Sequence, residues 1–262
     1  MRFRHLITSL LLAGSAGLAF SQDAFQQLED QLSRGLYNSA ALVSGPALVE
    51  ANPEDSRAWE LYARALLLTG DVTAARDAID TALRLVPLAE QPASAGNLLG
   101  LIMAEEDELP AALPLLRQAA ADSGSYLYAL DWGRTAWQAG DLEQAEEAFL
   151  AAAATTRGQR EPWPWLDVGR IRLIQDRLTE AEEAFEQAIA VYEAFDTGTS
   201  LPSPAYVEAF FRLGQIGERR FERSGDPADF EQARVNYSNA LVGDPNYGPA
   251  LRALVRLDQN RP

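Results

Sequence analysis

Apolar residues recur along this chain at the spacing of amphipathic helices, and the pattern itself repeats about every 34 residues. Each copy has two helical stretches separated by a short polar turn. One copy is formed, in order, by Trp59, Tyr62, Ala63, the Gly70-Asp71 turn, Ala75, Ile79, Ala82 and Pro87. The pattern therefore predicts pairs of helices joined by tight turns.

The residue types in each copy explain how such a pair would pack. A small residue in the first helix, such as Gly133 or Gly169, lets the second helix approach closely. An alanine in the second helix does the same from the other side, and a larger residue four positions later fills the space between pairs. Gly70-Asp71 and Gly140-Asp141 suit a helix end followed by a new N-cap. Because one pair cannot bury its apolar face alone, we expect the pairs to stack.

The series resembles the tetratricopeptide repeat, whose signature runs W-x2-L-G-x2-Y, then A-x3-F, then A and P. The resemblance covers residues 22–262, as about six repeats and a C-terminal capping helix at 248–260 in which Leu251, Leu254 and Leu257 are three apart. It implies an all-α fold, an α-solenoid of helix–turn–helix repeats that forms a right-handed superhelix. It also implies that partners bind on the concave surface, which the first helices line.

Five stretches depart from the regular repeat. Gly45-Pro46 falls inside a second helix and should kink or shorten it, and Pro114 should bend the start of its helix. Residues 155–164 and 196–204 are rich in Thr, Gly, Ser or Pro, which predicts surface loops. A first helix of unusual length is expected at 205–223.

Residues 1–21 are typical of a secretory signal peptide. Two arginines precede an uncharged apolar stretch at 6–20, which is shorter than the roughly 20 residues of a comfortable membrane span. Ala19 and Ser21 then have the spacing that signal peptidases prefer. We expect cleavage after Ser21, an exported protein that is periplasmic or secreted, and no stable membrane insertion afterwards. An uncleaved N-terminal anchor is the alternative.

Composition excludes several classes of function. The formal charge is −16, and all 22 basic residues are arginines, so nucleic acid would be repelled. The chain has no cysteine, and its single histidine, His5, lies in the expected signal peptide. The mature chain would thus lack the side chains most used in nucleophilic, general-base and zinc chemistry. We expect no enzyme activity, no cofactor and no metal.

Paired carboxylates are the remaining candidate for chemistry. The densest runs are residues 105–108, Glu146-Glu147 and Glu182-Glu183. They fall in predicted turns or on polar helix faces, and no calcium-loop pattern accompanies them. The sequence indicates solvated surface for all three.

The residue directly after each small packing residue should point into the concave groove. These residues are Arg64, Leu101, Arg134, Arg170 and Gln215. Three arginines in equivalent positions would form a cationic stripe, and a guanidinium suits a carboxylate because it can donate two hydrogen bonds at once. Each arginine could instead pair with a carboxylate three or four positions before it in its own helix. Those carboxylates are Glu60, Asp131 and Asp167.

Two tryptophans lie outside the signature positions and extend this candidate site. Trp137 is one turn beyond Arg134, and Trp163 is at the start of the next repeat. With Leu130, Leu166 and Leu173 they could form an apolar floor that anchors a partner segment. The alternative is that both tryptophans merely pack under the loop at 155–164.

These features favour an exported, non-enzymatic scaffold or adaptor that binds an acidic or amphipathic segment of a partner protein. We expect this adaptor to be a monomer. We keep two alternatives open. One is an enzyme, or an accessory subunit, of cell-wall or envelope metabolism. The other is a structural element that self-assembles end to end, which the polar face of the predicted terminal helix disfavours because it would cap the array as a monomer.

Overall fold

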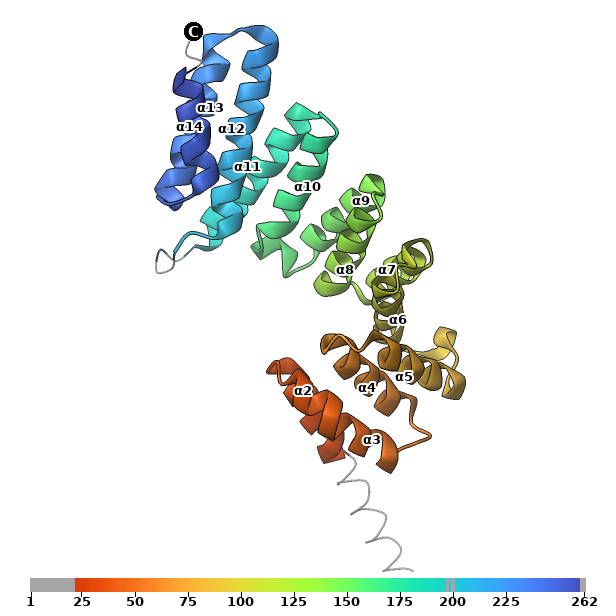
Figure 1. Ribbon diagram of the computed structural model, residues 1–262. Coiled ribbons are helices and arrows are strands. Elements are labelled where there is room, and N and C mark those ends of the chain that lie inside the picture. Colours follow the sequence, from red (N-terminus) through yellow and green to blue (C-terminus); the bar gives the residue numbers. More distant parts are fainter. Residues whose placement is uncertain (1–21, 197, 199–200, 260–262) are drawn as a thin grey trace, which may run out of the picture. The chain divides into compact units, whose positions relative to one another are not determined.

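The computed structural model describes residues 22–196, 198 and 201–259, and every regular element within them is a helix (Figure 1). Strands are absent from this part of the chain, as the repeat pattern predicted. None of its helices is both long and apolar enough to span a membrane. The expected signal peptide at 1–21 lies outside the described residues.

The chain divides into two compact units: unit 1 ends at Asp122, and unit 2 begins at Ser123. The boundary lies two residues before Gly124, whose φ of +59° lies outside the helical region and ends the preceding helix.

Unit 1 begins with a helical segment at residues 22–33. The elements that follow are α2 (Tyr37–Ser39), η1 (Ala40–Ser44), α3 (Gly45–Ala51), α4 (Ser56–Leu68), α5 (Val72–Leu85), η2 (Leu88–Glu90), α6 (Ala93–Glu105) and α7 (Leu109–Ser123). Helix α4 packs against α5, and α6 contacts both. A buried apolar cluster runs through these helices and includes Leu28, Leu61 and Ile79.

The interruption expected at Gly45-Pro46 is a π-helical turn. Element η1 is a π-helix that joins α2 to α3, and the Gly45 N–H bonds to the Ala40 carbonyl. Pro46 has no N–H for the carbonyl four residues earlier, so the wider turn accommodates it. A Cβ on Gly45 would collide with the Tyr62 ring, so this glycine also allows α3 to lie close to α4.

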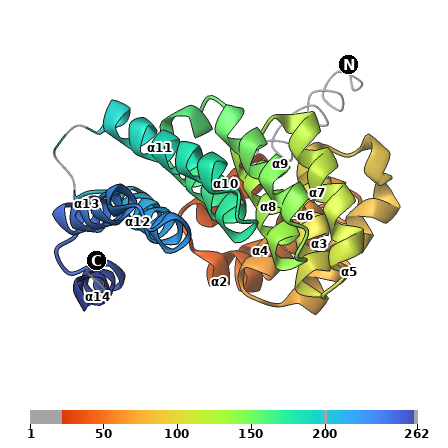
Figure 2. The same cartoon turned by 90° about the horizontal axis from the view of Figure 1, so that it is seen from above.

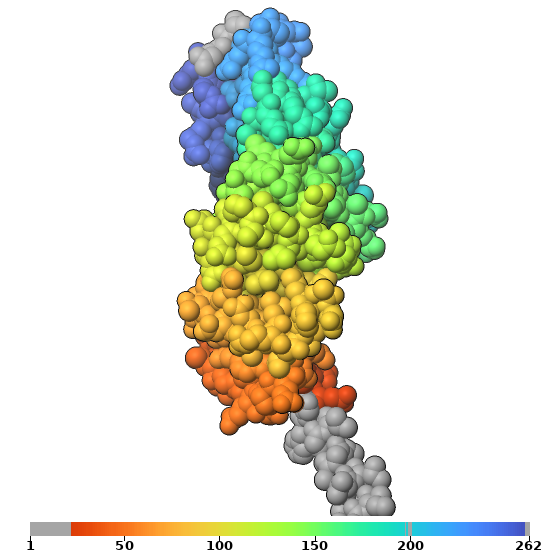
Figure 3. Space-filling model, turned by 90° about the vertical axis from the view of Figure 1, so that its right-hand side faces the viewer, coloured from red at the N-terminus to blue at the C-terminus, as the bar shows by residue number. Residues whose placement is uncertain are grey.

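Unit 2 continues the paired arrangement. Its elements are α8 (Tyr126–Gln138), α9 (Leu142–Ala154), η3 (Gly158–Arg160), α10 (Trp163–Ile174), α11 (Leu178–Phe195), α12 (Pro204–Ser224), α13 (Pro227–Gly243) and α14 (Gly248–Gln259). The pairs α8–α9, α10–α11 and α12–α13 are each in close contact, and α13 packs on α14. Figures 1 and 2 both show α12 beside α13. In Figure 3 the side chains of successive pairs of unit 2, coloured green to blue, touch one another.

The small residues pack as the pattern predicted. A Cβ on Gly133 would lie 2.7 Å from the Phe149 ring, and one on Gly169 would lie 2.5 Å from the Phe185 ring. Phe149 and Phe185 are 2% and 0% exposed. Each glycine therefore lets an aromatic ring of the second helix lie against the backbone of the first.

The turns within pairs also follow the prediction. Gly70 and Gly140 have φ of +83° and +76°, and the aspartate after each accepts a hydrogen bond from a backbone N–H of the next helix. In two other repeats the left-handed position is held by Asp107 and Asp176, at φ +64° and +62°. Aspartate tolerates this conformation better than most residues, although glycine adopts it at less cost.

The C-terminal helix packs through two alanines and two of its three leucines. Ala250, Ala253 and Leu257 are buried in α14, whereas Leu251 is 44% exposed. The buried residues follow the i, i+3, i+7 spacing of a helix face, and the two alanines let α14 lie close to its neighbours. Leu254 packs partly buried against the same cluster, and Leu251 lies on the exposed side of the helix.

Candidate functional site

Four of the candidate binding residues, Arg134, Trp137, Trp163 and Arg170, surround one pocket of unit 2. The pocket has a volume of about 390 Å³. It is lined by Arg134, Trp137 and Gln138 of α8, Phe149 of α9, and Trp163, Asp167 and Arg170 of α10. Helices α8 and α10 are the first helices of successive pairs, and this is why residues that follow Gly133 and Gly169 meet here.

The apolar part of the pocket is aromatic. The Trp137 ring packs edge-on against Phe149, with ring centroids 6.4 Å apart and an interplanar angle of 61°. Phe149 is the same ring that covers Gly133, so Trp137 rests on the core of its repeat. Trp163 is 37% exposed. An aromatic or long aliphatic side chain would find apolar surface on more than one side here.

The leucines expected to form the floor of the site do not line it. Leu130, Leu166 and Leu173 are 5%, 0% and 4% exposed, and they belong to the interior of the helix pairs. Phe149 takes their place. The sequence assigned Phe149 only to packing, because it occupies the aromatic position of the repeat signature.

Arg134 carries the available positive charge of the pocket. Its side chain is exposed, and among the described residues it has no hydrogen bond or ion pair. The alternative of pairing within its own helix therefore does not apply to Arg134. Its guanidinium is free to donate to an acceptor that enters the pocket.

Arg170 is held by two carboxylates. Its Nη1 donates to Asp167 Oδ1 at 2.7 Å, the pairing within the helix that the sequence offered as an alternative. Its Nε donates to Glu208 Oε1 at 3.0 Å and its Nη2 donates to Glu208 Oε2, an interaction with α12 that the sequence did not reveal. Arg170 thus serves the packing of repeats and shapes the pocket wall.

The pKa values of the two carboxylates that contact Arg170 are shifted in opposite directions. Burial raises the pKa of Asp167 above its ordinary value, and Arg170 and Arg134 only partly offset this effect. Burial also opposes ionisation of Glu208, but hydrogen bonds from Arg170 and Arg212 outweigh it and lower the pKa of Glu208. Of the two carboxylates that bind Arg170, Glu208 is therefore the more firmly ionised.

Three other candidates lie outside the pocket, and two of them, Arg64 and Leu101, belong to unit 1. Arg64 Nη2 pairs with Glu60 at 3.1 Å within α4, and Glu60 is buried. Leu101 is half-buried on α6. Gln215 accepts a hydrogen bond from Arg212 within α12.

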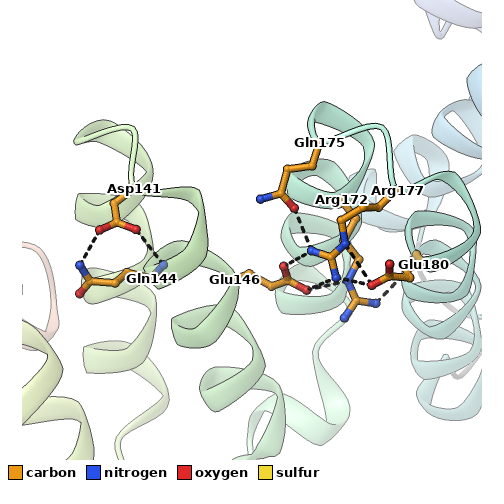
Figure 4. A network of polar contacts seen from close by, with 7 residues as sticks. All are labelled: Asp141, Gln144, Glu146, Arg172, Gln175, Arg177 and Glu180. Atoms are coloured by element: carbon orange, nitrogen blue, oxygen red, sulfur yellow. Dashed lines mark hydrogen bonds and ion pairs between the residues drawn. The ribbon is translucent and has the colours of Figure 1, made fainter.

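A second polar network, shown in Figure 4, links α9 to α10 and α11. Glu146 of α9 accepts from Arg172 Nε at 2.7 Å and from Arg177 Nη1 at 2.6 Å, and Arg177 also pairs with Glu180. Burial opposes ionisation of Glu146, but its two arginine partners outweigh this and lower its pKa.

The expectation that Glu146 and Glu182 are solvated surface was wrong. Glu146 is 13% exposed and joins two repeats, and Glu182 is half-buried against Arg220 of α12. Among the described residues, no group of three or more His, Asp or Glu side chains is placed to hold a metal ion.

Known proteins resemble this chain mainly through its fold. The Tetratricopeptide repeat family matches residues 46–95 and 130–190. No curated protein matches the sequence.

Three solved structures illustrate the likeness. The crystal structure of PilW, a widely conserved type IV pilus biogenesis factor, has a TM-score of 0.65 at 15% identity and covers 90% of this chain and 98% of its own. The structure of Pseudomonas aeruginosa pilF has a TM-score of 0.63 at 15% identity, with 94% and 100% covered. YrrB, a TPR protein with an unusual peptide-binding site, has a TM-score of 0.59 at 18% identity, with 80% and 96% covered.

These identities are low, so the likenesses concern the fold alone. Together with the family match and the helix pairs, they agree with the repeat pattern of the sequence. The described part of the chain is an all-helical array of paired helices of the tetratricopeptide-repeat kind, and its residues 46–95 and 130–190 match the repeat family itself.

Proposed function

We propose that this protein is an exported, non-enzymatic adaptor that binds a segment of a partner protein in the pocket between α8 and α10. The observation that carries the proposal is the combination of an unpaired Arg134 with Trp137 and the exposed Trp163 around one pocket. Tetratricopeptide repeats bind protein or peptide partners. The pocket supplies the two kinds of contact that anchor such partners, an aromatic surface and a guanidinium.

The chemistry of the pocket favours one kind of segment. An apolar side chain would enter between Trp137 and Trp163, and a neighbouring carboxylate would pair with Arg134. A basic group is disfavoured next to Arg134, whereas a carboxylate is attracted. Asp167 stays engaged with Arg170 and so restricts the position of the incoming carboxylate to the Arg134 side.

Export rests on residues 1–21, and non-enzymatic action rests on the lack of cysteine and of any histidine besides His5. PilW is described as a pilus biogenesis factor, which is an assembly role, and this supports the adaptor class.

Fractionation and intact mass of the native protein test export. Export predicts a periplasmic or secreted species that begins at Gln22, and a cytoplasmic species that retains residues 1–21 would contradict it.

Selection from a displayed peptide library tests the binding site. We expect enriched peptides to share an apolar residue beside a carboxylate, and we expect Arg134→Ala with Trp137→Ala to weaken them at least about tenfold. Arg84→Ala is the matched control, because Arg84 is exposed on α5 and lies outside the pocket. If both variants bind the selected peptides as the parent does, the pocket is not the binding site.

A further inference from the structure

Unit 2 has a second groove, which shares no residue with the pocket at Arg134. It lies between α11, α12 and α13 and has a volume of about 280 Å³. We call it the acidic groove and define it by Glu182, Glu186, Ile189, Glu193, Phe210 and Asn236. It is separate from the proposed partner pocket and is independent of it.

The charge of the acidic groove is unbalanced. Arg220 donates to both oxygens of Glu182, at 3.0 and 2.5 Å, so this guanidinium is already engaged. Glu186 and Glu193 are both exposed, and neither has an ion pair among the described residues. Tyr206 donates a hydrogen bond to Glu193 at 3.2 Å, which leaves its negative charge in place.

Apolar and aromatic surface accompanies these carboxylates. Ile189 lies between Glu186 and Glu193 along α11, and Phe210 faces it from α12. Tyr206 packs edge-on against Phe210, with ring centroids 5.0 Å apart. Aromatic rings beside carboxylates favour a cation that carries an apolar stem, as arginine and lysine do.

A buried amide in the wall of the groove gives a second, independent indication of a ligand. Asn236 of α13 is 6% exposed and lines the groove. Within the described part of the chain its side chain makes no hydrogen bond. Its amide atoms are not fully buried and reach the water of the groove, and a polar group of a bound segment would replace that water.

We propose that the acidic groove binds a basic amphipathic helix of a partner protein. Glu186 and Glu193 are seven residues apart, so they lie two helical turns, or about 10.5 Å, from each other. A partner helix with arginine or lysine seven positions apart matches this spacing. Its central apolar side chain rests on Ile189 and Phe210, and a polar group meets Asn236.

The test uses a fluorescent, end-capped helical peptide with two arginines seven positions apart and a leucine midway, titrated into the purified protein at low salt. We expect binding that falls with ionic strength and weakens at least about tenfold in Glu186→Arg with Glu193→Arg. That variant should instead bind the matching peptide with glutamates in place of the arginines. Replacing the central leucine by serine should weaken binding to the parent protein.

Glu183→Arg with Glu222→Arg is the matched control, because both residues are exposed, lie outside the groove and change the net charge equally. Equal weakening of peptide binding in this control would mean non-specific attraction and would overturn the proposal. Failure of the parent protein to bind the arginine peptide would also overturn it. The milder pair Glu186→Gln with Glu193→Gln, checked by circular dichroism, repeats the test if the arginine variant does not fold. Persistence of binding in Arg134→Ala with Trp137→Ala separates this site from the pocket.

Discussion

Arg170 of α10 holds Glu208 of α12 through two parallel hydrogen bonds, from Nε to Oε1 at 3.0 Å and from Nη2 to Oε2. The pair joins the first helices of successive repeats, and their side chains are only 29% and 16% exposed. A guanidinium fits this two-point geometry, and an ammonium group does not. The interaction therefore fixes the position of α12 beside the wall of the pocket.

Removing this guanidinium should destabilise unit 2. Arg170→Ala leaves Glu208 half-buried with only Arg212 as its partner, so we expect a loss of about 1–3 kcal/mol in the free energy of unfolding. Arg170→Lys should recover little of it. Arg234→Ala, which breaks an exposed pair with Glu231, serves as the control and should cost less than about 1 kcal/mol. Urea unfolding measures all three, and equal losses for Arg170→Ala and Arg234→Ala would contradict the assignment.

The close contact between Gly169 and Phe185 can be tested by enlarging the glycine. Gly169→Ala places a methyl group 2.5 Å from a fully buried ring, so we expect a loss of about 1–3 kcal/mol. Phe185→Leu makes room for that methyl group, so the double variant should lose less than the sum of the two single variants. A double-mutant cycle by denaturant unfolding gives this coupling. Strict additivity, within about 0.5 kcal/mol, would show that the two residues do not compete for the same space.

Acid should weaken unit 2 through Glu146 and Glu208. The pKa of each is below its ordinary value of 4.5 in the folded chain, so the folded state releases these protons more readily than the unfolded state. Their contribution to stability is complete above pH 4.5 and is lost as the pH falls through the lower folded values. Asp167 acts in the opposite direction, because burial raises its pKa.

Thermal unfolding of the parent and of Glu146→Gln, followed by circular dichroism from about pH 7 to about pH 3, measures this effect. The variant should be less stable than the parent at neutral pH, and its stability should fall less on acidification. Parallel curves for the two proteins would show that Glu146 is not responsible.

The helix pairs and their turns could be predicted because they depend on local spacing. Gly133 and Phe149 belong to one repeat, and the signature fixes which sides of their helices meet. The Gly140-Asp141 turn has a local cause as well, since the glycine supplies the positive φ and the aspartate caps the next helix.

The contacts between repeats could not be predicted in the same way. Arg170 and Glu208 are 38 residues apart, and their meeting depends on the length of α11 and on the connection to α12. Spacing along the chain does not determine that geometry. For the same reason, the burial of Glu146 was missed, because its two arginine partners come from the following repeat.

Site-specific photocrosslinking in the native host tests the central claim most directly. A crosslinker at Gln138, which is exposed and lines the pocket, should give a discrete adduct with one partner protein. The account predicts that this adduct disappears when Arg134→Ala and Trp137→Ala are added, and that a crosslinker at Arg84 does not give it. The same adducts at Gln138 and Arg84, or an adduct that survives both substitutions, would contradict partner binding in this pocket.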